Sequence, residues 1–249
     1  MVAQAGPGRI ELFEDFFSGS KQGATVADNA DETPIGPFRI FGQGADEADA
    51  GALSISATSG AVRLTTTDEA DHAIFVGTNL GMSAEANGHL VLETRVQFNN
   101  LATKEAFIGF ADVAGLAQTI EGGIAHGGTA TLTLTASDIC GFLLSAELTE
   151  DEMWHFIHNG GATTGVTDST ALESDVDAVA GEWDILRIEI DPNGTARWYI
   201  NGVLKKTLAG AVAPSVVLAA MVGVEAKGAA IEEMDVDYLK VCLNRDWSR

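Results

Sequence analysis

Residues 182–208 read EWDILRIEIDPNGTARWYINGVLKKTL, and apolar and polar side chains alternate on both sides of a turn. Alternation with a period of two is typical of half-buried strands, so two antiparallel strands are predicted. The turn, residues 191–194, joins a proline that fixes φ to a glycine that can take a positive φ. That combination favours a type I turn closed by a glycine bulge. The resulting register pairs Leu186 with Ile200, Ile188 with Trp198, and Ile190 with Ala196.

A second turn follows at Asn201 and Gly202, a dipeptide that favours a two-residue hairpin turn of the primed type. The stretch therefore predicts a meander of at least three antiparallel strands. A plain two-residue loop would place Lys205 beside Trp198, so the facing of the third strand is left open.

The charge of the 249-residue chain excludes some partners. With 36 acidic and 14 basic side chains, the net charge of -22 repels phosphate, and no nucleic-acid partner is expected. The first residues lack a basic region followed by an apolar core, and no apolar run is long enough to span a membrane. Neither export nor a membrane partner is therefore expected. Cys140 and Cys242 are expected to be buried free thiols, with a mutual disulfide as the alternative.

The chain is expected to form a flexible arm at residues 1–9 and a single domain at residues 10–249, because no linker or repeat divides it. Short apolar segments separated by turn residues predict an all-β fold, a two-sheet antiparallel sandwich with little helix. Residues 115–128 are rich in glycine and are interpreted as a loop or insertion. Residues 147–158 fit a helical turn opened by a capping box, and they fit an alternating strand equally well.

Several segments occur in an order that resembles the concanavalin A-like lectin/glucanase jelly roll, and in particular the versions found in virion proteins of tailed bacteriophages. They are FEDFF (13–17), VRLTTT (62–67), LVLETRVQF (90–98), AFIGFAD (106–112), the meander, and VDYLKV (236–241). The resemblance covers nearly the whole chain and implies a jelly-roll sandwich. The resemblance implies less about function, because proteins with this sandwich include enzymes, lectins and structural modules.

The phage resemblance implies a virion structural protein, assembled in the host cytoplasm and located on the capsid surface. Its expected role is that of a capsid decoration or cement protein, which binds the assembled head and so stabilises it by mass action. The expected partners are the major capsid protein or another virion protein, and a homo-oligomer is plausible on symmetry grounds. The first alternative is a carbohydrate-binding, lectin-like tail or fibre domain for host attachment. The second is a diverged glycoside hydrolase.

Glucanases of this fold carry a strand motif, Glu-x-Asp-x-Glu or Glu-x-Asp-x-x-Glu, whose alternate positions line one cleft. Three acidic segments approach this motif without completing it. Residues 182–184 are followed by Arg187 at the acid position, residues 189–191 run into Pro192, and residues 233–237 end in aspartate. Because the motif is incomplete, the chain is not expected to be an enzyme.

Candidate metal ligands occur at two places, and of the two only the calcium site is predicted, because the histidines of the other are interpreted as polar residues around a buried Trp154. The resemblance implies a structural calcium ion held between the first and last strands, where Asp15 and Asp237 lie, and no other cofactor is expected. His155 and His158 are three residues apart, a spacing that can hold zinc on a helix.

Sugar sites on such sandwiches combine an aromatic platform with polar side chains on loops. Trp154 and Trp247 are the candidate platforms, because Trp183 and Trp198 lie in alternating strands and are expected in the core.

Overall fold

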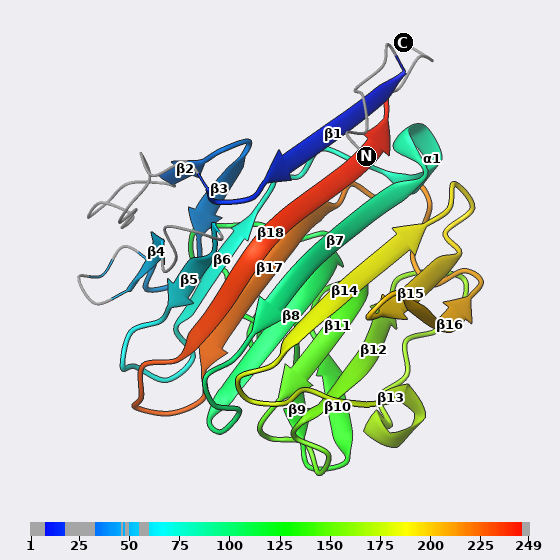
Figure 1. The fold of residues 1–249 in the computed structure, drawn as a ribbon. Coiled ribbons are helices and arrows are strands. Elements are labelled where there is room, and N and C mark those ends of the chain that lie inside the picture. The colour runs from blue at the N-terminus through cyan, green and yellow to red at the C-terminus, as the bar shows by residue number, and fades with distance from the viewer. Residues whose placement is uncertain (1–7, 18–32, 46, 48–49, 55–59, 246–249) are drawn as a thin grey trace.

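The computed structural model describes residues 8–17, 33–45, 47, 50–54 and 60–245, which form two antiparallel sheets packed face to face (Figure 1). Sheet 1 runs in the order β16-β15-β14-β7-β18-β5-β4, with β1 paired to β18. Its strands are β1 (Arg9–Glu14), β4 (Gly51–Ser54), β5 (Val62–Thr65), β7 (Leu90–Gln97), β14 (Trp183–Ile190), β15 (Ala196–Ile200), β16 (Val203–Leu208) and β18 (Glu233–Asn244).

Sheet 2 runs in the order β13-β12-β11-β8-β17-β6-β3-β2. Its strands are β2 (Thr33–Ile35), β3 (Phe38–Phe41), β6 (Ala73–Gly77), β8 (Lys104–Ala111), β11 (Ile139–Ser145), β12 (Met153–Asn159), β13 (Glu173–Asp177) and β17 (Ala219–Ala226). Helical structure in the described residues is confined to α1 (Ala84–Asn87) and a 3₁₀ turn at Ser169–Leu172. The prediction of an all-β, two-sheet antiparallel sandwich with little helix is confirmed.

The first hairpin of the meander forms as predicted. Leu186 pairs with Ile200, Ile188 with Trp198, and Ile190 with Ala196. At the second turn, Asn201 and Gly202 both take a positive φ, as a primed hairpin turn requires. A register shift between Trp198 and Tyr199 then sets Lys206, rather than Lys205, beside Trp198. This irregularity answers the question that the sequence left open.

The main core lies between the sheets, because alternate residues of each strand point inward. In β7, for example, every second residue is buried. Trp198 of sheet 1 is fully buried, and its indole Nε1 donates a hydrogen bond to the carbonyl oxygen of Gly141 on sheet 2, 3.0 Å away. Cys140 and Cys242 are buried free thiols, as predicted.

A second apolar cluster covers the outer face of sheet 2. Residues 112–138, here called the cover, connect β8 to β11 and include the hairpin of β9 (Ala125–Gly128) and β10 (Thr131–Leu134). Ile120, Ile124 and Leu132 of the cover pack against outward-facing sheet residues such as Phe75 and Phe107. Part of the glycine-rich segment predicted as a loop is therefore strand, and it buries a sheet face that would otherwise meet solvent.

Residues 147–158 follow their alternation rather than the capping-box pattern, since β12 occupies their second half. Of the expected arm, only Gly8 and Arg9 lie within the described residues, and Arg9 is the first residue of β1. No helix in the part of the chain that the structure describes is long and apolar enough to cross a membrane.

Candidate functional site

The outer face of sheet 1 carries a row of charged and aromatic side chains, here called the outer ladder: Glu93, Arg187, Glu189, Tyr199 and Tyr238. They come from β7, β14, β15 and β18, which lie next to one another in the sheet (Figure 1). Their neighbours along each strand point into the core, so strand alternation turns the ladder residues toward solvent. Cross-strand register places Arg187 opposite both Glu93 and Tyr199.

Arg187 is the centre of the outer ladder. Its Nη1 lies 3.5 Å from Oε2 of Glu93, and its Nη2 contacts Oε1 of Glu189. The guanidinium carbon lies 5.6 Å from the centre of the Tyr199 ring, within the range of a cation–π contact. Tyr199 donates its hydroxyl to Glu189 and Tyr238 donates its hydroxyl to Glu93, each over 3.1 Å.

A hollow of about 210 Å³ opens within the outer ladder, lined by Glu93, Ile185, Arg187, Glu189, Tyr199 and Gly202. Burial, and then the nearby Glu189, raises the pKa of Tyr199. Burial, and then Glu93, raises the pKa of Tyr238. Both phenols therefore stay protonated at neutral pH and serve as donors. The hollow offers carboxylate acceptors, a guanidinium donor and an aromatic ring to one small ligand.

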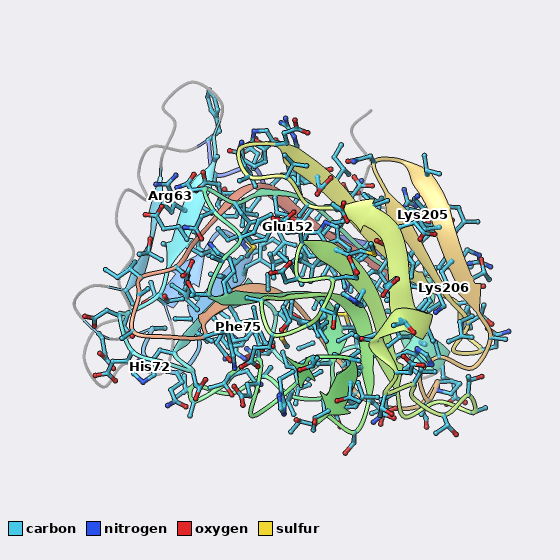
Figure 2. All side chains as sticks on the ribbon, turned by 90° about the horizontal axis from the view of Figure 1, so that it is seen from below. Arg63, His72, Phe75, Glu152, Lys205 and Lys206 are labelled. Atoms are coloured by element: carbon cyan, nitrogen blue, oxygen red, sulfur yellow. The ribbon has the colours of Figure 1, made fainter. Side chains whose placement is uncertain are left out.

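A second hollow, here called the loop pocket, has a volume of about 430 Å³ and lies at one end of the sandwich. It is lined by residues 99–102, Glu152 and residues 178–180, from the loops before β8, β12 and β14. Figure 2 looks onto this end of the molecule, where Glu152 is labelled. The lining is mostly apolar and lacks an aromatic ring, so it suits a polar sugar less well than the outer ladder does.

Of the two candidate platforms for a sugar, Trp154 lies within the described residues, and it lines neither hollow. Trp154 is fully buried, its ring centre lies 6.0 Å from that of Phe98 in a tilted arrangement, and its indole N–H donates a hydrogen bond to Asp184 over 3.0 Å. Trp247 lies outside the described residues. Trp183 is half-buried beside Arg95, whose guanidinium carbon is 4.7 Å from its ring centre.

The predicted calcium ligands are engaged elsewhere. Asp237 accepts a hydrogen bond from Nη1 of Arg95 over 2.9 Å, and the exposed Asp15 accepts one from the backbone N–H of Phe17 over 3.1 Å. Neither belongs to the groups of candidate metal ligands found among the described residues. A calcium ion between Asp15 and Asp237 stays a prediction.

His155 and His158 lie on strand β12, not on a helix. Three residues along a strand bring side chains to opposite faces, so the two imidazoles point away from each other. Both are buried, and burial lowers the pKa of each imidazole. The structure does not bring them together as zinc ligands.

The nearest approach to the glucanase motif is occupied by an ion pair. Arg63 contacts Glu233 at 3.0 Å and binds both carboxylate oxygens of Asp235, at 2.7 and 3.0 Å. These acidic side chains serve to hold β5 against β18.

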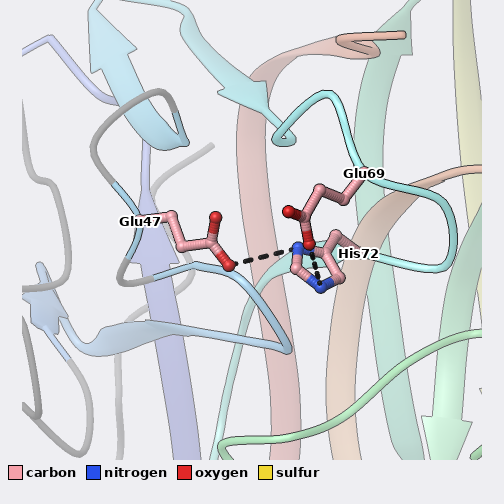
Figure 3. Close-up of side chains that lie close together, drawn as sticks. All are labelled: Glu47, Glu69 and His72. Carbon is pink, nitrogen blue, oxygen red and sulfur yellow. Dashed lines mark ion pairs between the residues drawn. The ribbon is translucent and has the colours of Figure 1, made fainter. Parts of the chain in front are cut away.

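Two further acidic groups lie at one end of sheet 2, near the start of β6 and the end of β17. In the first, His72 contacts Glu47 at 3.4 Å and Glu69 at 3.3 Å (Figure 3). The Thr67 hydroxyl lies 2.9 Å from Nδ1 of the same imidazole. These contacts account for both ring nitrogens of His72, and the glutamates are partly exposed.

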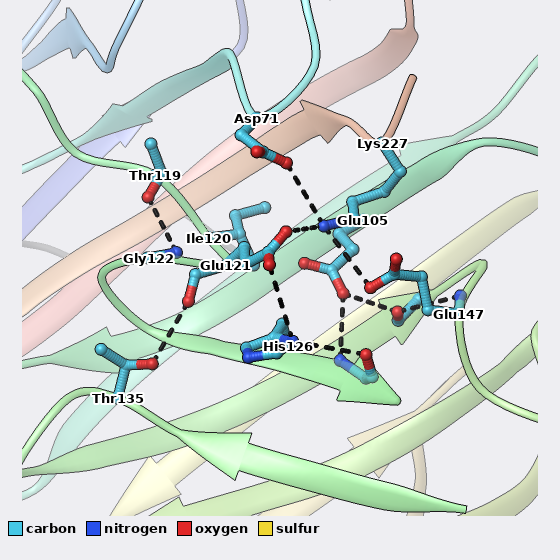
Figure 4. A network of polar contacts seen from close by, with 12 residues as sticks. Asp71, Glu105, Thr119, Ile120, Glu121, Gly122, His126, Thr135, Glu147 and Lys227 are labelled. Atoms are coloured by element: carbon cyan, nitrogen blue, oxygen red, sulfur yellow. Dashed lines mark hydrogen bonds and ion pairs between the residues drawn. The ribbon is translucent and has the colours of Figure 1, made fainter. Parts of the chain in front are cut away.

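The second acidic group lies beneath the cover, where Glu105, Glu121, Glu147 and Asp71 converge around Lys227 (Figure 4). Glu225 stands directly opposite Glu105 in the pairing of β17 with β8. Burial, and then the neighbouring Glu105, raises the pKa of Glu225 to about 8.

No protein-family profile matches this chain, and no curated protein sequence matches it. Solved structures do resemble it. The carbohydrate recognition domain of Emp47p has a TM-score of 0.58 at 11% identity, covering 94% of this chain and 95% of that one. A Bacillus licheniformis β-glucanase has a TM-score of 0.53 at 13% identity, covering 96% and 99%. The carbohydrate esterase vb_24B_21 from the Shiga toxin-encoding bacteriophage phi24B has a TM-score of 0.51 at 16% identity, covering 94% and 97%.

The chain therefore has the concanavalin A-like jelly-roll fold of the lectin and glucanase group. This is a fold of carbohydrate-binding and glycan-active proteins. From the incomplete strand motif we predicted that the protein is not an enzyme. This prediction is wrong, because structures with this fold include a glucanase and an esterase. At these identities the likeness concerns the fold, and the chemistry of the site has to come from the chain's own residues.

Proposed function

We propose that the outer ladder is a carbohydrate-binding site. The observation that carries the proposal is the hollow in which Arg187, two carboxylates and the Tyr199 ring face solvent together. A sugar ring has an apolar C–H face, which an aromatic ring can cover, and a rim of hydroxyls that charged groups bind strongly. The volume of about 210 Å³ lies below the roughly 300 Å³ at which pockets for larger ligands begin, so one sugar unit is expected to enter.

The lectin and glucanase neighbours support carbohydrate as the ligand class. The outer ladder also fits this class electrostatically. Its carboxylates are paired with Arg187 and its phenols are neutral donors, so a neutral, hydroxyl-rich ligand can exchange hydrogen bonds without meeting an unpaired charge.

Replacing Arg187 or Tyr199 with alanine is expected to weaken glycan binding by about tenfold or more, because each change removes a charge-assisted hydrogen bond or the ring contact. A glycan array on the wild-type chain identifies the ligand, and calorimetry measures its affinity for the variants. Lys240→Ala is the matched control, since Lys240 pairs with Glu11 at 3.7 Å and does not line the hollow. An array without hits, or a hit whose affinity neither variant changes, would contradict the proposal.

The same ligand is also incubated with the protein and assayed for new reducing ends. The outer ladder holds two carboxylates, Glu93 and Glu189, and the fold also carries glucanases. Release of reducing sugar that Glu93→Gln abolishes would assign the site to glycan cleavage as well as binding.

We further propose that the protein acts in a phage virion, on the capsid surface as a decoration protein. The phage-type order of sequence segments and the similarity to a bacteriophage carbohydrate esterase support this location. Mass spectrometry of separated heads and tails from the encoding phage is expected to find the chain with the heads. Recovery with tails would favour the fibre alternative, and absence from both would reject a virion role.

A further inference from the structure

The acidic group beneath the cover contains more carboxyl groups than its single ammonium can pair with. Lys227 contacts Asp71 at 3.4 Å, Glu147 at 3.5 Å and Glu121. Glu105 and Glu225 lie deeper, both fully buried, and neither forms an ion pair with Lys227. The group thus holds five carboxyl groups and one lysine, which contacts the three outer ones and neither of the two innermost.

The deepest carboxylate is left partly unsatisfied. Oε1 of Glu105 accepts hydrogen bonds from the Ser145 hydroxyl at 2.6 Å and from the backbone N–H of Gly127 at 3.2 Å. Oε2 of the same group is buried and has no hydrogen-bond partner among the residues that the structure describes. An acceptor buried without a partner destabilises a fold unless something supplies positive charge or a proton. This atom is an observation independent of the acidic cluster, and it indicates a ligand.

We propose that a divalent cation of the calcium type binds between Asp71, Glu121 and Glu225, next to Glu105, which stands opposite Glu225 in the sheet. One carboxylate oxygen from each of the first three lies within 4.8 Å of the others. Calcium takes its oxygens at about 2.3–2.6 Å, so two ligands on one ion lie up to about 5 Å apart. The spacing fits without rearrangement of the strands.

The donor set selects the kind of metal. The three proposed ligand groups are all carboxylates, and hard oxygen donors in an irregular arrangement suit calcium better than zinc, which prefers nitrogen and sulfur. An ion can enter from solvent, since the Asp71 side chain is 56% exposed and that of Glu121 is 33% exposed. Lys227 can keep Glu147 as its partner when the ion binds, because Glu147 is not one of the three proposed ligands.

The position of the site connects metal binding to the cover. Glu225 already accepts hydrogen bonds from the backbone N–H groups of Ile120 and Glu121. Glu121 belongs to the cover, Glu225 to sheet 2, and Asp71 to the loop before β6. A bound ion would therefore join three segments that are distant in the sequence and hold the cover against sheet 2.

Calcium is added to the EDTA-treated chain at neutral pH, and binding is followed by calorimetry and thermal unfolding. One ion per chain and a rise in Tm of about 5–10 °C at a hundredfold excess over Kd are expected. Asp71→Asn and Glu121→Gln, both at accessible positions, should each weaken binding by about tenfold. Glu69→Gln is the matched control, because it changes the acidic group around His72 and should leave binding unaffected.

Circular dichroism establishes that each variant is folded before it is titrated. Absence of calcium heat together with an unchanged Tm in the wild-type chain would overturn the proposal. Binding that survives both Asp71→Asn and Glu121→Gln would overturn it as well, and so would binding that Glu69→Gln abolishes.

Discussion

Trp198→Ala is expected to lower the free energy of unfolding by about 3–5 kcal/mol, the range found when a large buried aromatic side chain is removed. Trp198 is fully buried between the sheets and packs at 5.9 Å from Phe156, centre to centre. Alanine would leave a cavity where the two sheets meet. It would also remove the hydrogen bond that joins the indole to Gly141 on the opposite sheet.

Urea unfolding at equilibrium measures this loss, and the neighbouring position provides a control. Tyr199 follows Trp198 on the same strand but belongs to the outer ladder and points away from the core. Tyr199→Ala is therefore expected to lower the free energy of unfolding by only about 1 kcal/mol. Trp198→Phe keeps most of the apolar volume and loses the donor, and it should lie between the two. If Trp198→Ala cost no more than Tyr199→Ala, the facing of this strand would be contradicted.

The register that buries Trp198 could be predicted from the sequence because it depends on local features. The glycine at the first turn and the alternation on each side of it admit one pairing of apolar residues. The third strand could not be placed in the same way. Its register depends on the shift between Trp198 and Tyr199, which leaves Lys205 as an extra residue between the pairs Tyr199–Leu204 and Trp198–Lys206. Nothing in the composition of the strand indicates where such an irregularity occurs.

Only some residues of the outer ladder could be assigned to one face from the sequence. Arg187, Glu189 and Tyr199 belong to one hairpin, so alternation alone assigns them to one face, and an aromatic residue on that polar face was the available signal. Glu93 and Tyr238 come from β7 and β18, which join the same site only through the order of strands in the sheet. That order depends on contacts between distant segments.

The acidic group beneath the cover was not predicted at all. Glu105 and Glu225 meet because β8 and β17 are neighbours in sheet 2, and they are buried because the cover folds back over that sheet. A glycine-rich segment without hydrophobic periodicity gives no indication of the surface against which it packs. His155 and His158 show a different difficulty. The same three-residue spacing would bring the two side chains together on a helix, but on a strand it places them on opposite faces.

Lys104→Met is expected to lower the free energy of unfolding by about 3–5 kcal/mol, because it leaves a buried carboxylate without its cation. Lys104 is fully buried, and its Nζ lies 2.8 Å from Oε2 of Glu232, which is itself 2% exposed. The same Nζ donates a hydrogen bond to the backbone carbonyl of Glu233 over 3.2 Å. Burial lowers the pKa of this lysine, whereas its carboxylate partner favours the charged form.

The double variant Lys104→Met/Glu232→Leu separates the net contribution of the ion pair to the free energy of unfolding from the loss of stability caused by removing one partner. Two apolar side chains of similar size can replace a buried ion pair with little change in stability, so the double variant is expected to recover most of the loss and lie within about 1 kcal/mol of wild type. Urea unfolding of the wild type, both single variants and the double variant completes the cycle. A double variant no more stable than Lys104→Met would mean that Lys104 acts mainly through Glu233 and the loop before β8, which lines the loop pocket.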